Sequence, residues 1–167
     1  MIPPLIVRAA LDNGLNLIAI TDHNASENVS AVIKAASGKD LTVLPGMELQ
    51  TEEDVHVLCL FDNLDQLNQL QALVDKNLPD VPNNPDFFGE QFIVDHTGEF
   101  IRRKNRLLIN ATTLSFEETF EFVNRLGGLF IPAHVNRQAF GLIDHLGFVP
   151  PDLDVEALEI SRHIEYQ

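Results

Sequence analysis

Short apolar runs of strand length alternate with stretches of helical spacing along most of the sequence. The runs include "LNLIAIT" at residues 15–21, "LTVLPGMELQ" at 41–50, "VHVLCLF" at 55–61 and "LFIPAH" at 129–134. Between them, leucines recur at helical intervals in "LDQLNQLQALVDKNL" at 64–78. This alternation predicts an α/β fold in which helices cover a largely parallel sheet.

Capping residues and turn signals suggest the other elements. Pro3-Pro4 and Gly14 bracket a first helix, and Asn24 or Ser26 caps a second helix that ends near Ala36. Further expected elements are a hairpin of the strands at 41–50 and 55–61, two short strands around residues 96–98, a strand at 107–111, a helix that opens with the capping box Ser115–Glu118, a short helix at 140–147 and a last strand at 157–163.

The chain has the length of one domain, 167 residues, and can bury a sizeable core. The alternation of elements is interrupted by "PDVPNNPDFFGEQ" at 79–91, which is rich in Pro and Asn and therefore typical of a loop. We expect a single domain, residues 1–167, with an insertion at about 79–114.

Charge and composition exclude some partners. The net charge of −14 disfavours broad contact with nucleic acid, which needs clustered Lys and Arg. No apolar run is long enough to span a membrane. The single cysteine, Cys59, lies in an apolar run and reads as an inert core thiol. We expect a cytoplasmic protein.

Residues of metal-ligand type follow the apolar runs. Asp22 and His23 end the first run, Glu48 lies near the end of the second, and His134 ends "LFIPAH". His56 lies inside "VHVLCLF". Ligands gather at the carboxyl ends of strands in α/β folds, and imidazole and carboxylate bind Zn, Mn and Fe.

Each of these residues also has an ordinary interpretation. His56 alone would be a hydrogen-bonded core residue, and Asp22 and His23 could cap the next helix. Glu48 could be a surface carboxylate and His134 a loop residue. Only their joint placement at successive strand ends favours a metal site.

Arginines and lysines are few, so their positions are informative. Arg137, three residues after His134, could bind a phosphate group bidentately. The densest basic cluster, Arg102, Arg103, Lys104 and Arg106, could do likewise from the expected insertion. The simpler interpretation of that cluster, a solvated strand face, is favoured.

The ordered set "GLNLIAITDHN", "VLPGMELQT", "VHVLCLF", "GGLFIPAHVNR" and "LEISR" resembles the PHP (polymerase and histidinol phosphatase) family, especially its small metal-dependent phosphoesterases. The resemblance implies a distorted (β/α)7 barrel with up to three divalent metal ions (Zn, Mn or Fe) and a small phosphorylated substrate. It implies that His23 binds one metal, that Glu48 bridges two, and that His56 and His134 hold another. Asp22 and Arg137 would support catalysis of phosphate-ester hydrolysis by metal-activated water.

The sequence also departs from the family pattern. The family's first strand, which ends His-x-His, and its final Asp-x-His pair have no counterpart here. We therefore expect a partial barrel that lacks its first strand and its C-terminal part, with fewer metals and weak or absent activity. Three further expectations follow: a non-catalytic remnant that binds a metal or a partner as the alternative function, self-association through the open barrel edge, and 3′–5′ exonuclease action as a third option that the charge disfavours.

Overall fold

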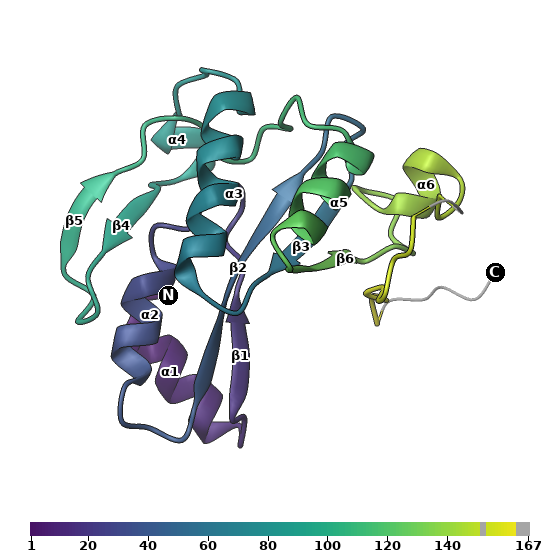
Figure 1. Ribbon diagram of the computed structural model, residues 1–167. Helices are drawn as coiled ribbons and strands as arrows, with labels where there is room; N and C mark the ends of the chain where they lie inside the picture. Colours follow the sequence, from purple (N-terminus) through teal and green to yellow (C-terminus); the bar gives the residue numbers. More distant parts are fainter. Residues whose placement is uncertain (151–152, 163–167) are drawn as a thin grey trace.

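The computed structural model describes residues 1–150 and 153–162 and has a mixed α/β fold (Figure 1). Its main sheet has the strand order β1-β2-β3-β6. The bounds of these strands are Leu17–Ile20 for β1, Thr42–Gln50 for β2, His56–Leu60 for β3 and Leu129–Pro132 for β6. The predicted α/β class is therefore confirmed.

The prediction of a largely parallel sheet was wrong. Strands β1 and β2 are parallel, but β3 runs antiparallel to both of its neighbours, β2 and β6. Residues 51–55 alone connect β2 to β3, whereas a parallel connection needs a crossover of about a dozen residues or more. The expected hairpin is confirmed, and it brings the first residue of β3, His56, to the edge where β2 ends.

Helices cover one face of this sheet. They are α1 (Pro3–Asp12), α2 (Val29–Ala36), α3 (Leu64–Asn77) and α5 (Phe116–Arg125). The predicted capping box of α5 is present, because Ser115 accepts the Glu118 N–H and Glu118 accepts the Ser115 N–H. Helix α2 begins at Val29 without a side-chain cap, so the expected cap by Asn24 or Ser26 was wrong.

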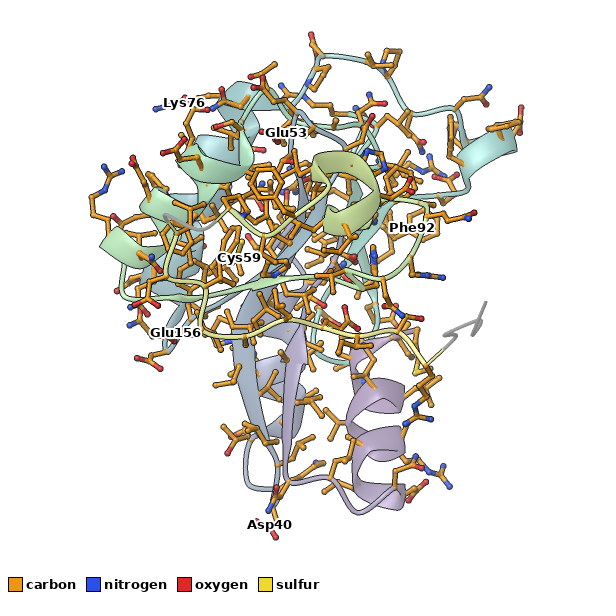
Figure 2. All side chains as sticks on the ribbon, turned by 90° about the vertical axis from the view of Figure 1, so that its right-hand side faces the viewer. Asp40, Glu53, Cys59, Lys76, Phe92 and Glu156 are labelled. Atoms are coloured by element: carbon orange, nitrogen blue, oxygen red, sulfur yellow. The ribbon has the colours of Figure 1, made fainter. Side chains whose placement is uncertain are left out.

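The two faces of the sheet differ in burial. Met47, Leu49, Val57 and Cys59 point to the helices and are fully buried. Figure 2 shows Asp40 and Glu53 beyond opposite ends of β2, with Cys59 in the densely packed region between them. The alternate residues face the other way and are only partly buried: Leu44, Leu58, Leu60, Leu129 and Ile131. Glu48 and His56 lie on this second, less covered face.

The stretch 79–114 carries short elements of its own. It contains helix α4 (Pro85–Phe88) and the antiparallel strands β4 (Phe92–Val94) and β5 (Phe100–Arg103), which form a separate sheet (Figure 1). The two predicted strands around residues 96–98 are thereby confirmed. The predicted strand at 107–111 was wrong: these residues form turns, and their carbonyl groups bind a side chain of the main sheet's edge, as described below.

After β6 the chain is less regular. Helix α6 (Leu142–Leu146) matches the predicted short helix. Residues 157–162 do not form the predicted strand, although Glu159 exchanges backbone hydrogen bonds with Pro132 and Val135. Residue His163 of that prediction lies outside the described residues. Among the helices of residues 1–150 and 153–162, none combines the length and apolar character needed to cross a membrane.

Candidate metal centre

The pairing of β1 with β2 continues past the end of β1. Residues His23 and Glu48 form an isolated parallel bridge. The Glu48 N–H donates to the Asp22 carbonyl at 3.2 Å, and the Asn24 N–H donates to the Glu48 carbonyl at 2.9 Å. This backbone pairing fixes the side chain of His23 next to that of Glu48.

Three imidazoles surround the Glu48 carboxylate. Glu48 Oε1 lies 3.2 Å from His56 Nδ1 and 3.6 Å from His134 Nε2, and Glu48 Oε2 lies 4.0 Å from His23 Nε2. The facing nitrogens of His56 and His134 are 3.2 Å apart. Ligand atoms of His23, Glu48 and His56 all fall within 4.8 Å of one another. We call the four residues His23, Glu48, His56 and His134 the His/Glu cluster.

Each member of the cluster comes from a different segment of the sheet edge. His23 follows β1, Glu48 belongs to β2, His56 opens β3, and His134 follows β6. The Ala133 N–H donates to the His56 carbonyl at 2.9 Å, which holds the end of β6 against the start of β3. The antiparallel direction of β3 is what places His56 at this edge.

Burial and neighbouring charges tune the cluster. Burial, reinforced by the neighbouring histidines, lowers the pKa of both His23 and His134. Burial alone would raise the pKa of Glu48, but the hydrogen bond from His56 and the charges of the three histidines outweigh it and lower that pKa. The resulting state near pH 7 is a carboxylate facing neutral imidazoles at His23 and His134. This is the protonation state that metal binding requires.

In the part of the chain that the structure describes, each imidazole of the cluster has one nitrogen without a partner and one that faces Glu48. Within residues 1–150 and 153–162, His23 Nδ1, His56 Nε2 and His134 Nδ1 are buried without a hydrogen-bond partner. The other nitrogen of each ring faces the Glu48 carboxylate. Buried polar groups are normally satisfied, but these unpartnered nitrogens are not the ones that face the carboxylate. The case for a divalent cation therefore depends on the three nitrogens that face Glu48.

Sequence reasoning missed the role of Asn24, which it treated as a possible helix cap. Asn24 is fully buried and has a left-handed φ of +47°. Its Nδ2 donates to the carbonyls of Leu108 and Asn110, both at 2.9 Å, and its Oδ1 accepts the Gln50 N–H. Asn24 therefore ties the stretch 79–114 to β2 beside the cluster.

Two further residues support the cluster. The ring of Phe140 stacks on His56 with centroids 4.5 Å apart. Glu159 Oε2 accepts the His134 N–H at 2.9 Å. Neither residue carries a sequence signal of its own, because both contacts join segments that are brought together only by the fold.

The two predicted catalytic residues lie at the border of the cluster. Asp22 is exposed and lines cavities next to His23. Arg137 is exposed, its N–H donates to the His134 carbonyl, and its positive charge contributes to the lowered pKa of His134.

Arg102 and Arg103 lie on the fully exposed strand β5, as the favoured interpretation of a solvated strand face expects, and each member of the basic cluster at 102–106 also has a carboxylate partner. Arg102 and Lys104 pair with Glu27, and Lys104 also lies 3.3 Å from Asp75. Arg103 pairs with Glu90, and Arg106 with Asp80. Lys104 is the most buried of these basic side chains, with 14% of its side chain exposed.

The fold and the site together define a class of protein. It is the class of α/β proteins in which histidines and a glutamate of metal-ligand type meet at one edge of the sheet. The sequence matches the PHP domain over residues 3–129, and the chain belongs to this family. The match includes His23, Glu48 and His56 and ends before His134. A search of the curated proteins finds no significant match.

Solved structures share the fold. The lesion-specific endonuclease Q of Pyrococcus furiosus is 20% identical with a TM-score of 0.63, and the match covers 96% of this chain and 37% of that one. A candidate metal-dependent phosphoesterase of Bifidobacterium adolescentis is 19% identical with a TM-score of 0.60, covering 95% and 71%. An amidohydrolase of Chromobacterium violaceum with bound sulfate is 15% identical with a TM-score of 0.57, covering 95% and 71%. This chain thus spans about a third of the length of endonuclease Q.

Proposed function

We propose that this protein is a metal-dependent phosphoesterase that hydrolyses phosphate esters of small molecules. The observation that carries the proposal is the His/Glu cluster, in which Glu48 faces the ring nitrogens of His23, His56 and His134. The chain's membership of the PHP domain family and its likeness to a candidate phosphoesterase support the same chemistry.

The proposed roles follow from the donor set. His23, Glu48, His56 and His134 would hold the divalent ion, whether Zn, Mn or Fe, since imidazole and carboxylate suit all three. The ion, when bound, supplies positive charge for the phosphoryl oxygens and lowers the pKa of water to about 7. Arg137 would orient a phosphoryl oxygen, and Asp22 would accept a proton at the edge of the site.

We expect weak turnover. Four donors suffice for one catalytic site, which typically uses three protein ligands, but not for the pair of ions that clamps the attacking and leaving oxygens in two-metal sites. We also propose that the α/β fold is an incomplete PHP barrel and that residues 79–114 are an insertion in it.

The alternative is a non-catalytic domain that binds a metal or a partner. The small number of donors in the cluster favours it. Nucleic acid is a further candidate substrate, since endonuclease Q has been captured with an abasic duplex. We place it behind small esters because the net charge of −14 opposes a long polyanion.

Phosphate release from p-nitrophenyl phosphate tests the proposal. We expect slow release with added Mn²⁺ that disappears with chelator and in Glu48→Gln, and that persists in His145→Gln, an exposed histidine on α6. A chain that binds metal but neither releases phosphate nor binds orthovanadate would favour the non-catalytic alternative. Release that persists in Glu48→Gln would show that the cluster is not the active site.

A further inference from the structure

Residues 156–162, which we call the strap, contact the loop that carries His134 at the end of β6 (Figure 1). The Glu159 N–H donates to the Pro132 carbonyl at 3.0 Å, and the Glu159 carbonyl accepts the Val135 N–H at 2.9 Å. The Glu159 carboxylate accepts the His134 N–H, also at 2.9 Å. One residue of the strap therefore binds the chain before, at and after His134.

The backbone of His134 is in an uncommon conformation. Its φ is +33°, in the left-handed region that residues other than glycine adopt rarely. Such a conformation persists where the surrounding structure holds it. The His134 carbonyl accepts the Arg137 N–H from within the same loop, whereas the Glu159 carboxylate holds the His134 N–H from outside the loop. The direction of the His134 ring, whose Nε2 lies 3.6 Å from Glu48 Oε1, depends on this backbone.

The strap depends in turn on the same loop. Its side chains Leu158 and Ile160 are 44% and 64% exposed, so burial of apolar surface holds it only weakly. A second link lies two residues beyond Glu159. Asn136 Nδ2 donates to the Ser161 carbonyl at 3.2 Å, and Asn136 Oδ1 accepts the Ser161 N–H at 2.8 Å. The hydrogen bonds that fix the loop are therefore also those that attach the strap.

We propose that Glu159 is a positioning residue of the metal centre: it holds His134 in its left-handed conformation, and a metal ion bound at the His/Glu cluster stabilises the strap in return. The inference rests on the proposed metal centre and names a residue that acts through one of its ligands. The two effects belong together because the same hydrogen bonds order the loop and the strap, and coupling between two equilibria is reciprocal.

Calorimetric titration with Zn²⁺ tests the positioning role. Glu159→Ala removes both the acceptor and the charge, whereas Glu159→Gln keeps an acceptor oxygen and removes the charge alone. We expect the affinity for Zn²⁺ to fall about tenfold in Glu159→Ala. In Glu159→Gln it should fall by no more than about threefold, because a neutral acceptor replaces a charged one.

Glu156→Ala is the matched control, since Glu156 is an exposed carboxylate of the same strap without a hydrogen bond or ion pair to the described residues. It should bind Zn²⁺ as the wild type does. Wild-type affinity in Glu159→Ala would overturn the inference. Equal losses in Glu159→Ala and Glu159→Gln would also overturn it, because they would assign the effect to charge.

Backbone hydrogen exchange tests the reciprocal effect without relying on turnover. In chelator-treated wild type, saturating Zn²⁺ should slow exchange in peptides that cover the strap, where the Glu159 and Ser161 N–H groups bond to the loop. In His134→Asn the same addition should leave strap exchange unchanged. Strap exchange that Zn²⁺ does not alter in the wild type would overturn the coupling.

The outcomes separate this inference from the proposals on which it builds. Absence of Zn²⁺ binding by the wild type would overturn the metal centre and the role of Glu159 together. Wild-type binding by Glu159→Ala would overturn the role of Glu159 alone. Neither strap experiment decides the phosphoesterase proposal, which depends on release from p-nitrophenyl phosphate.

Discussion

The ring of Phe140 lies parallel to the imidazole of His56, with centroids 4.5 Å apart and planes inclined by 5°. The Phe140 carbonyl also accepts the His56 N–H at 3.1 Å. Phe140 adopts a φ of +60°, a conformation that is an outlier for a bulky residue. Such strained residues persist where the surrounding structure holds them, often beside functional sites. We infer that Phe140 positions His56 for metal binding.

Replacing Phe140 should therefore change metal affinity. Phe140→Ala frees the His56 ring and should weaken Zn²⁺ binding by about tenfold, the usual size of effect for a group that orients a ligand. Phe140→Tyr keeps the stack and should bind as wild type. Calorimetric titration of both variants measures the difference, and equal affinities for alanine and tyrosine would show that the stack has no positioning role.

The Asn24 side chain should contribute strongly to the free energy of unfolding. Asn24→Ala leaves the Leu108 and Asn110 carbonyls without their donor. It also puts alanine at a positive φ, which asparagine tolerates better. We expect the free energy of unfolding to fall by more than about 2 kcal/mol. Asn24→Gly removes the same amide but accepts the backbone conformation, so it separates the two causes. Urea unfolding measures both, and a loss below about 0.5 kcal/mol, typical of neutral surface substitutions, would contradict this account.

The metal-free protein should lose stability in mild acid. Burial lowers the folded-state pKa of His23 and His134 below 6.5. Below pH 6.5 the unfolded chain therefore binds protons that the folded chain does not, and the free energy of unfolding falls as pH decreases through that value. Urea midpoints of chelator-treated protein at about pH 7.5 and about pH 6 test this. A double variant with asparagine at both positions should show a smaller difference, and an unchanged wild-type midpoint would refute the prediction.

Self-association remains a prediction. Strand β1 pairs with β2 on one side, and within residues 1–150 and 153–162 no strand pairs with its other side. Leu17 on this edge is 53% exposed, and the less covered sheet face adds the partly buried side chains of Leu58 and Ile131. Open edges beside apolar surface invite pairing with another chain. Light scattering should report masses above 18.7 kDa that grow with concentration. Ile131→Glu should reduce them, and a wild-type monomer at every concentration would rule the association out.

Much of this fold could be predicted from local signals. The capping box at Ser115, the proline start of α1 and the periodicity of α3 are properties of a few neighbouring residues, and each was confirmed. The direction of β3 depends on the short connection between β2 and β3. That connection allows a hairpin but is too short for the crossover of a parallel pair, so it outweighs the general β/α pattern.

Contacts that span long sequence separations could not be predicted in this way. The turn at 107–111 looks like an apolar strand, but its carbonyl groups bind Asn24, more than eighty residues earlier. Residues 157–162 form no strand, although Glu159 exchanges backbone hydrogen bonds with Pro132 and Val135. The stack of Phe140 on His56 likewise depends on a left-handed residue that no sequence pattern indicates.

The central claim is that His23, Glu48, His56 and His134 form one metal centre. Calorimetric titration of chelator-treated protein with Zn²⁺ and with Mn²⁺ tests it most directly. We predict saturable binding in the wild type and in His145→Gln, and affinities reduced at least about tenfold in Glu48→Gln and in His56→Asn, with both variants still folded by circular dichroism. Wild-type affinity in folded Glu48→Gln and His56→Asn would contradict the claim.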